Sequence, residues 1–222
     1  GRTRTPAGAN EGGGKNERPG QMRPDAHPPD PRRILFIGSF AHLPNLMALR
    51  FFREQAWPAL RAAGATLHVI AAARPDHYRE LYRDRVTLDL PQPGVELEAF
   101  VADVRPAYER AAAVIAPLLA SAGTNIKILE AMAMGKAIVS TPAGVNGLEL
   151  EPGADYLLAE SGPAFAAALL ELFENPARRA ELERRARATA ERRFDWDVIA
   201  RRQAALYARL ISSASPSARS SP

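Results

Sequence analysis

The sequence predicts an α/β fold in which a parallel β-sheet is covered by helices on both faces, a Rossmann-like layout. Short apolar runs of strand type alternate with longer segments of helical spacing, the pattern of parallel strands joined by helical crossovers. A chain of 222 residues, 46% of them apolar, can bury one hydrophobic core of this kind. Gly and polar residues follow several apolar runs, so they are expected where the strands end.

The expected elements run in order from residue 34 to residue 211. Ile34 to Ile37 is a β-type apolar run that ends at Gly38, and the segment 45–63 after it has apolar residues at helical spacing. Asp103 opens the helical segment 103–112 and is expected to be its N-cap. Further strands are expected at 66–70, 95–101, 114–117, 137–141 and 156–158, and further helices around Glu130 and at 163–174, 176–193 and 196–211.

The two ends of the chain differ in composition from its body, residues 32–211. Residues 1–31 are rich in Gly and Pro and residues 212–222 in Ser and Pro, so both predict disordered tails or linkers. No apolar run approaches the roughly 20 residues that cross a bilayer, and the N-terminus lacks the pattern of a secretion signal. Cysteine is absent, which excludes disulfides, thiol catalysis and thiolate metal sites. Together these features favour a cytoplasmic protein.

The net charge of +4 and the isoelectric point near 9.7 raise the question of a nucleic-acid partner. The arginines are interleaved with Glu and Asp, most densely in 178–193, whereas duplex binders cluster positive charge. A solvated helix face with mixed charge pairs accounts for this pattern, so no nucleic-acid partner is expected. Peripheral contact of a basic helix face with anionic lipid stays open as an alternative.

Candidate ligand-binding residues follow the first strand. In α/β sheets ligands bind outside the carboxyl ends of the strands, where Gly38, Asp103, Gly123 and Thr141 are expected. The loop 38–45, GSFAHLPN, has neither a GxGxxG fingerprint nor a GxxxxGK[ST] phosphate loop. Gly38 would let the backbone approach a ligand, with polar contacts from Ser39 and Asn45. The alternative is a tight turn with Asn45 capping the next helix.

A second candidate segment begins at Gly123. Thr124 or Asn125 is expected to cap a helix whose free amides would hold an anion. Lys127 lies in the first turn, where the helix dipole disfavours a cation unless a bound anion such as a diphosphate reverses the penalty. Glu130, one turn further on, can accept hydrogen bonds from two ribose hydroxyls. The alternatives are a surface lysine paired with an acid and a salt bridge between Lys127 and Glu130.

The run NIKILEAMAMGKAIVSTPAGVNGLE resembles the donor-binding half of GT-B glycosyltransferases, in particular family 4. Members carry a strand, a Glu-Gly-Phe-Gly turn and a helix with a second Glu, followed by Ala-Met-Ala-x-Gly and another strand. The turn matches 122–125 and the second Glu matches Glu130. GSFAHLPN, VELEAFVADVRPAYERAAAVIAPL and FDWDVIARR are similar to further parts of the same domain, so the resemblance covers roughly residues 33–210.

This resemblance implies that the fold is one half of a GT-B enzyme and that it binds a UDP-, GDP- or ADP-sugar. The backbone near Phe100 and Val101 would meet the nucleobase, and Glu130 the ribose hydroxyls. The amides of 123–125, with Lys127, would hold the diphosphate, and Lys127 would stabilise it as it departs. Members transfer the sugar with retention of configuration and need no cofactor and no tightly bound metal.

Two departures from the family pattern leave the activity of this chain open. Ala122 stands where the first family Glu usually touches the transferred sugar, and only the donor half of a GT-B enzyme is represented. The leading hypothesis is a donor-binding domain that works with an acceptor-binding domain or subunit supplied elsewhere. The alternatives are a degenerate nucleotide-binding module without transfer activity and an unrelated Rossmann-like binding protein.

Overall fold

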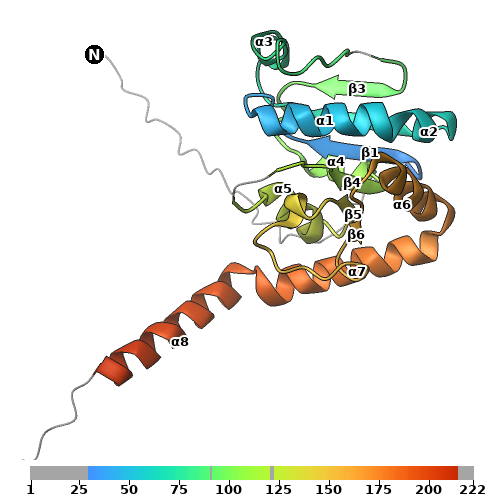
Figure 1. The fold of residues 1–222 in the computed structure, drawn as a ribbon. Helices are drawn as coiled ribbons and strands as arrows, with labels where there is room; N and C mark the ends of the chain where they lie inside the picture. Colours follow the sequence, from blue (N-terminus) through green and yellow to red (C-terminus); the bar gives the residue numbers. More distant parts are fainter. Residues whose placement is uncertain (1–29, 91, 121–122, 215–222) are drawn as a thin grey trace, which may run out of the picture.

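The computed structural model describes residues 30–90, 92–120 and 123–214. Most of the tails expected at residues 1–31 and 212–222 lies outside these residues, namely 1–29 and 215–222, as does Ala122 in the predicted turn. Six parallel strands form one sheet (Figure 1) with the order β3-β2-β1-β4-β5-β6. The strands are β1 (Arg33–Ile37), β2 (Thr66–Ile70), β3 (Val95–Glu98), β4 (Ala113–Ala116), β5 (Ala137–Ser140) and β6 (Leu157–Leu158). This confirms the predicted parallel α/β fold.

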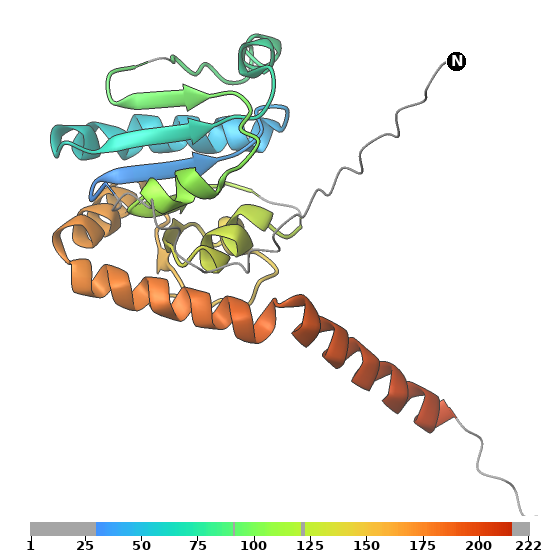
Figure 2. The same cartoon turned by 180° about the vertical axis from the view of Figure 1, so that it is seen from behind.

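Helices cover both faces of the sheet (Figures 1 and 2). Within β1, Ile34 and Phe36 face one layer and Leu35 the other, because side chains alternate along a strand. Both faces of β1 are buried, which is why it reads as a continuous apolar run. One layer contains α1 (Leu43–Gln55), α2 (Trp57–Ala62) and α6 (Gly162–Glu174). The other contains α4 (Arg105–Arg110), α5 (Ile126–Ala133) and two buried alanines of α7 (Pro176–Arg193), Ala186 and Ala190.

Several boundaries differ from the expected ones. The helix expected over 45–63 is divided at Ala56, because Pro58 has no N–H to continue the hydrogen-bond ladder of α1 into α2. A short helix, α3 (Pro75–Leu81), and a 3₁₀ turn, η1 (Ala143–Val145), were not predicted. The strand expected over 95–101 ends at Glu98.

Asp103 does not cap the helix that follows it, so this prediction is wrong. The N-cap of α4 is Val104, which offers no side-chain hydrogen bond. The Asp103 carboxylate instead accepts a hydrogen bond from the backbone N–H of Arg105 at 3.0 Å and forms an ion pair with the Arg105 guanidinium at 2.9 Å. Asp103 therefore binds the first amide of α4 from one residue before the N-cap position.

The last helix, α8 (Trp196–Ala214), extends away from the body of the domain (Figures 1 and 2) and continues past residue 211, the expected end of the folded region. Large apolar side chains on it are exposed: Trp196 by 82%, Leu206 by 45% and Tyr207 by 54%. Among the described helices, none is long and apolar enough to cross a membrane.

Four arginines of α7 form ion pairs with acids on the same helix, whereas Arg178 and Arg193 pair with Glu171 and Glu149 outside it. Arg184 and Arg185 both pair with Glu181, and Arg187 pairs with Glu191. This is the solvated face with mixed charge pairs that the interleaved sequence indicated.

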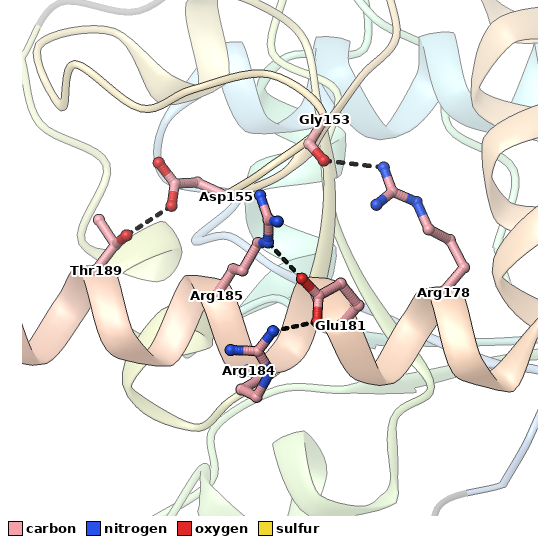
Figure 3. Close-up of polar contacts among 7 residues, drawn as sticks. All are labelled: Gly153, Asp155, Arg178, Glu181, Arg184, Arg185 and Thr189. Atoms are coloured by element: carbon pink, nitrogen blue, oxygen red, sulfur yellow. Dashed lines mark hydrogen bonds and ion pairs between the residues drawn. The ribbon is translucent and has the colours of Figure 1, made fainter.

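Polar contacts attach α7 to the loop that precedes β6, and two of them are drawn in Figure 3. The Thr189 hydroxyl donates to Asp155 Oδ1 at 2.7 Å, and both residues are buried. The Arg178 guanidinium donates to the Gly153 carbonyl at 2.9 Å. These contacts hold the loop that leads into β6, the last strand of the sheet, against the outer helix.

The Thr189→Val variant is expected to lose about 1–3 kcal/mol of unfolding free energy, because Asp155 stays buried and loses a hydrogen-bond donor. Urea unfolding followed by circular dichroism measures this loss. The matched control is Arg184→Ala on the same helix, which removes only an exposed ion pair and should leave the unfolding free energy almost unchanged. Equal stabilities of Thr189→Val and the wild type would contradict the role given to the buried contact.

Candidate active site at the carboxyl ends of the strands

The two candidate segments meet in one cleft of about 830 Å³. The first segment follows β1 and enters α1, and the second follows β4 and enters α5. They come together because β1 and β4 are neighbours in the sheet, so their carboxyl ends lie side by side. The predicted site residues that line the cleft are Gly38, Ser39, Asn45, Thr124, Asn125, Lys127 and Glu130.

The other predicted residues do not line this cleft. Phe100 is 73% exposed, and Val101 is partly buried against the helix layer formed by α4, α5 and α7. Asp103 interacts with Arg105, as described above. Gly123 directly precedes the lining residue Thr124 and has a φ of 103°, a conformation that favours glycine.

The Lys127 side chain is partly buried and reaches across the cleft to α1. Its Nζ donates a hydrogen bond to Asn45 Oδ1 at 2.9 Å and lies 5.4 Å from the centre of the Phe36 ring. Burial lowers the pKa of Lys127 to about 8, and the nearby charge of Glu130 opposes this shift. Lys127 is therefore not the surface lysine paired with an acid that the sequence left open.

Asn45 lies inside the first turn of α1 rather than at its N-cap. The N-cap is His42, and Pro44 occupies the start of the helix, so the alternative of a capping Asn45 is wrong. The Asn45 amide Nδ2 donates to the Ser39 carbonyl at 2.9 Å. His42 and Pro44 both line the cleft, although no pattern in the sequence singles them out.

Glu130 faces the same cleft from α5. Its Oε2 accepts a hydrogen bond from the Tyr108 hydroxyl of α4 at 3.0 Å. Burial, together with the charge of Glu130, raises the pKa of Tyr108, so this hydroxyl remains a donor. Among the ion pairs of the described residues there is none between Lys127 and Glu130. No local motif marks Tyr108, which sequence reasoning missed.

The beginning of α5 forms one wall of the cleft. Asn125 is its N-cap residue, as expected, but the Asn125 side chain makes no capping hydrogen bond. It donates instead to the Gly144 carbonyl at 2.9 Å and so attaches the helix to η1. A Cβ at Gly144 would lie 2.6 Å from the Ala116 carbonyl oxygen, so only glycine lets η1 pack against the end of β4. The first-turn amides of α5 and its positive dipole end are thus held at the cleft.

The arrangement suits an anionic ligand with neighbouring hydroxyl groups. Lys127 and the first-turn amides of α5 supply positive charge and donors, and Glu130 supplies a fixed acceptor one helical turn away. Among the described residues, Glu130 Oε1 and two of the three ammonium hydrogens of Lys127 have no hydrogen-bond partner in the protein. These atoms are available to a ligand.

The Tyr108→Phe variant is expected to weaken binding of a ribose-containing ligand by about 0.5–1.5 kcal/mol, because Glu130 loses the hydrogen bond that orients it. The loss is measured by calorimetric titration with UDP. The Tyr82→Phe variant is a matched control, since the Tyr82 hydroxyl donates to the Ala41 carbonyl and Tyr82 does not line the cleft. An equal loss in both variants would contradict a specific role for Tyr108.

Comparison with known proteins yields a family match and a group of similar folds. The model of the family described as "Glycosyl transferases group 1" matches residues 31–175. Among curated proteins, none matches the chain at a significant level. More than a hundred chains of solved structures match this chain. The three described next are 16–22% identical to it in sequence.

S. aureus TarM, solved in a complex that contains UDP, has a TM-score of 0.64 and 16% identity, over 84% of this chain and 37% of that one. Anabaena HepE in complex with UDP and glucose has a TM-score of 0.59 and 22% identity, over 82% and 48%. The C-terminal domain of the group 1 protein LpcC from Francisella tularensis has a TM-score of 0.59 and 19% identity, over 76% and 89%. The chain thus spans less than half of TarM and HepE and most of an isolated C-terminal domain.

Proposed function

This chain belongs to the glycosyl transferases group 1 family, and on that premise we propose that it binds the nucleotide-diphosphate sugar of a retaining glycosyltransferase. One observation carries the proposal: Lys127 and Glu130 line a single cleft together with the first turn of α5. That combination matches a diphosphate next to a ribose, since the cation and amides suit the former and the carboxylate suits the latter.

In the proposed complex the diphosphate lies against Lys127 and the amides at the start of α5. The ribose hydroxyls donate to Glu130, and the nucleobase extends toward Phe100 and Val101, beyond the carboxyl end of β3. No metal and no other cofactor is assigned a role in this proposal. TarM and HepE have been solved in complexes that contain UDP, which makes a UDP-sugar the first donor to test, ahead of GDP- and ADP-sugars.

In the proposed reaction, the bond between the anomeric carbon and the diphosphate oxygen breaks, and the electron pair stays on the diphosphate. The anomeric carbon then forms a bond to an acceptor hydroxyl oxygen on the same face of the sugar, and the hydroxyl proton passes to the leaving diphosphate. Lys127 and the positive end of α5 stabilise the charge that develops on the leaving diphosphate. Lys127 therefore acts as the catalytic residue of this half of the enzyme.

The acceptor would be held by a second domain or subunit. Large apolar side chains are exposed at the proposed donor site: Ile126, which lines the cleft, by 68%, and Leu119, between the lining residues Leu118 and Ala120, by 53%. Exposed apolar patches of this kind mark interaction surfaces. The exposed apolar residues of α8 offer a further surface, for which an acceptor domain or an anionic membrane is the proposed partner.

Calorimetric titration of the purified chain with UDP, GDP and ADP tests the proposal. Saturable 1:1 binding of one of them supports the donor site and identifies the donor class, and binding to none contradicts it. An assay for sugar transfer or donor hydrolysis with the acceptor-binding partner present then separates an active donor half from a degenerate nucleotide-binding module.

A further inference from the structure

We propose that Asn45 is the positioning residue for Lys127: its amide oxygen holds the lysine ammonium over the cleft so that a diphosphate meets a cation already in place. The contact joins α1 and α5 through two residues that are 82 positions apart in the chain. Its effect on nucleotide binding rests on the proposed function, whereas the contact itself can be tested without any nucleotide.

The hydrogen bond that Asn45 Nδ2 donates fixes the orientation of the Asn45 amide. Nδ2 donates to the Ser39 carbonyl at 2.9 Å, which leaves Oδ1 to accept from Lys127 Nζ, also at 2.9 Å. If the amide were turned around, Nδ2 would face the ammonium donors and Oδ1 would face a carbonyl, so both contacts would be lost. The loop after β1 therefore determines that an acceptor, not a donor, points at Lys127.

Residues at the end of β1 pack against the contact between Asn45 and Lys127. A Cβ at Gly38 would lie 2.9 Å from Asn45 Cγ and 3.1 Å from Phe36 Cε1, so the absence of a side chain at Gly38 makes room for the Asn45 amide. The Phe36 ring lies 5.4 Å from Lys127 Nζ and presents an aromatic surface to the ammonium. Gly38, Phe36 and Asn45 thus form one support for the lysine.

Lys127 needs this support because its position is unfavourable for a cation. It lies in the first turn of α5, where the helix dipole is positive, and burial lowers its pKa to about 8. A neutral amide favours the ammonium without cancelling its charge, whereas a carboxylate at the same point would compete with a diphosphate. The other titratable groups around Lys127 are Glu130 on α5, whose charge raises the pKa, His42 at the cleft, and Tyr108 of α4, which contacts the Lys127 carbonyl at 3.4 Å.

Lysine NMR tests the contact directly, because the chain has only three lysines, Lys15, Lys127 and Lys136. The Asn45→Leu variant is expected to lower the Lys127 pKa by about one unit, since the ammonium loses its acceptor. The Asn45→Asp variant is expected to raise it, since a carboxylate replaces the amide. The Lys136 pKa is the internal control and should not change, because its Nζ donates to the Glu109 and Ala111 carbonyls away from the cleft.

Opposite shifts of the Lys127 pKa in the two variants would support the proposal. An unchanged Lys127 pKa in both variants would overturn it, and so would shifts in the same direction, which indicate only a disturbed loop. This result does not depend on whether the chain binds a nucleotide, so a failure of the proposed function remains distinguishable.

Titration with UDP and with uridine then tests the consequence for binding. At pH 7.5 the Asn45→Leu variant is expected to bind UDP about tenfold more weakly than the wild type, with uridine binding unchanged. In a Lys127→Met background the same substitution should change UDP affinity less than about twofold, because Asn45 then has no ammonium to position. An equal loss of UDP affinity on replacing Asn45 in the wild-type and Lys127→Met backgrounds would contradict a role exerted through Lys127.

The pH dependence of UDP binding gives a further test. Wild-type UDP affinity should fall as the pH rises through about 8, and this fall should begin at lower pH in Asn45→Leu.

Discussion

Replacing Lys127 with methionine is expected to weaken UDP binding by about 1.5–3 kcal/mol, roughly a 10- to 150-fold increase in Kd. Methionine keeps much of the length and apolar character of the lysine side chain but has no positive charge. The diphosphate would then face the amides of α5 alone, and the contact between Lys127 Nζ and Asn45 Oδ1 would be lost. Calorimetric titration at pH 7 measures the change, because the ammonium is mostly charged there when its pKa is about 8.

The Lys136→Met variant is the matched control for this prediction. Lys136 is also a buried lysine, but its Nζ donates to the Glu109 and Ala111 carbonyls and it does not line the cleft. Its removal should lower stability while leaving the Kd for UDP unchanged. Retained UDP affinity in Lys127→Met would show that the diphosphate is not bound at this lysine, and an equal loss in both variants would point to a general effect on folding.

Replacing Glu130 with alanine is expected to weaken UDP binding by about 1–3 kcal/mol, because ribose hydroxyls would be left without an acceptor. The Tyr108 hydroxyl would also lose its hydrogen bond to Glu130 and keep only the 3.4 Å contact with the Lys127 carbonyl. The Glu130→Gln variant keeps one acceptor oxygen and should fall between the wild type and Glu130→Ala. Calorimetric titration of each variant with UDP measures the order of the three affinities.

A comparison of UDP with 2′-deoxy-UDP provides the sharpest control for Glu130. If this carboxylate accepts from the ribose, 2′-deoxy-UDP should lose less affinity than UDP when Glu130 is replaced by alanine. The Glu160→Ala variant, which removes an exposed carboxylate outside the cleft, should bind both ligands as the wild type does. Unchanged UDP affinity in Glu130→Ala would place the ribose elsewhere.

The local pattern of residues was sufficient for most of the fold. The strand expected at 66–70 is β2, and the apolar runs that became β1, β4 and β5 are each within one residue of their expected ends. Strands buried on both faces must be apolar throughout, and such runs are visible in a single sequence. Helix boundaries were less accurate: Ala56 divides the first predicted helix, and Asp103 lies one residue too early to cap α4.

The two segments that line the cleft were also identified from the sequence, since Gly and polar residues follow buried strands there. Their partners inside the cleft were not. Tyr108 contacts Glu130 from a helix 22 residues away in the chain, and Phe36, which looked like an ordinary core residue, lies beneath Lys127. Neither contact can be predicted from the spacing of residues in the sequence.

The sequence by itself determined a parallel α/β domain, a family and the residue types that gather at the carboxyl ends of its strands, because all of these depend on patterns local to the chain. Only the tertiary structure decided which of those ends are neighbours. The chain crosses over so that β4 pairs with β1, and this pairing alone brings Asn45 of α1 to Lys127 of α5. The order of strands in a sheet depends on contacts between distant segments, and those contacts determined which of the candidate residues share one site.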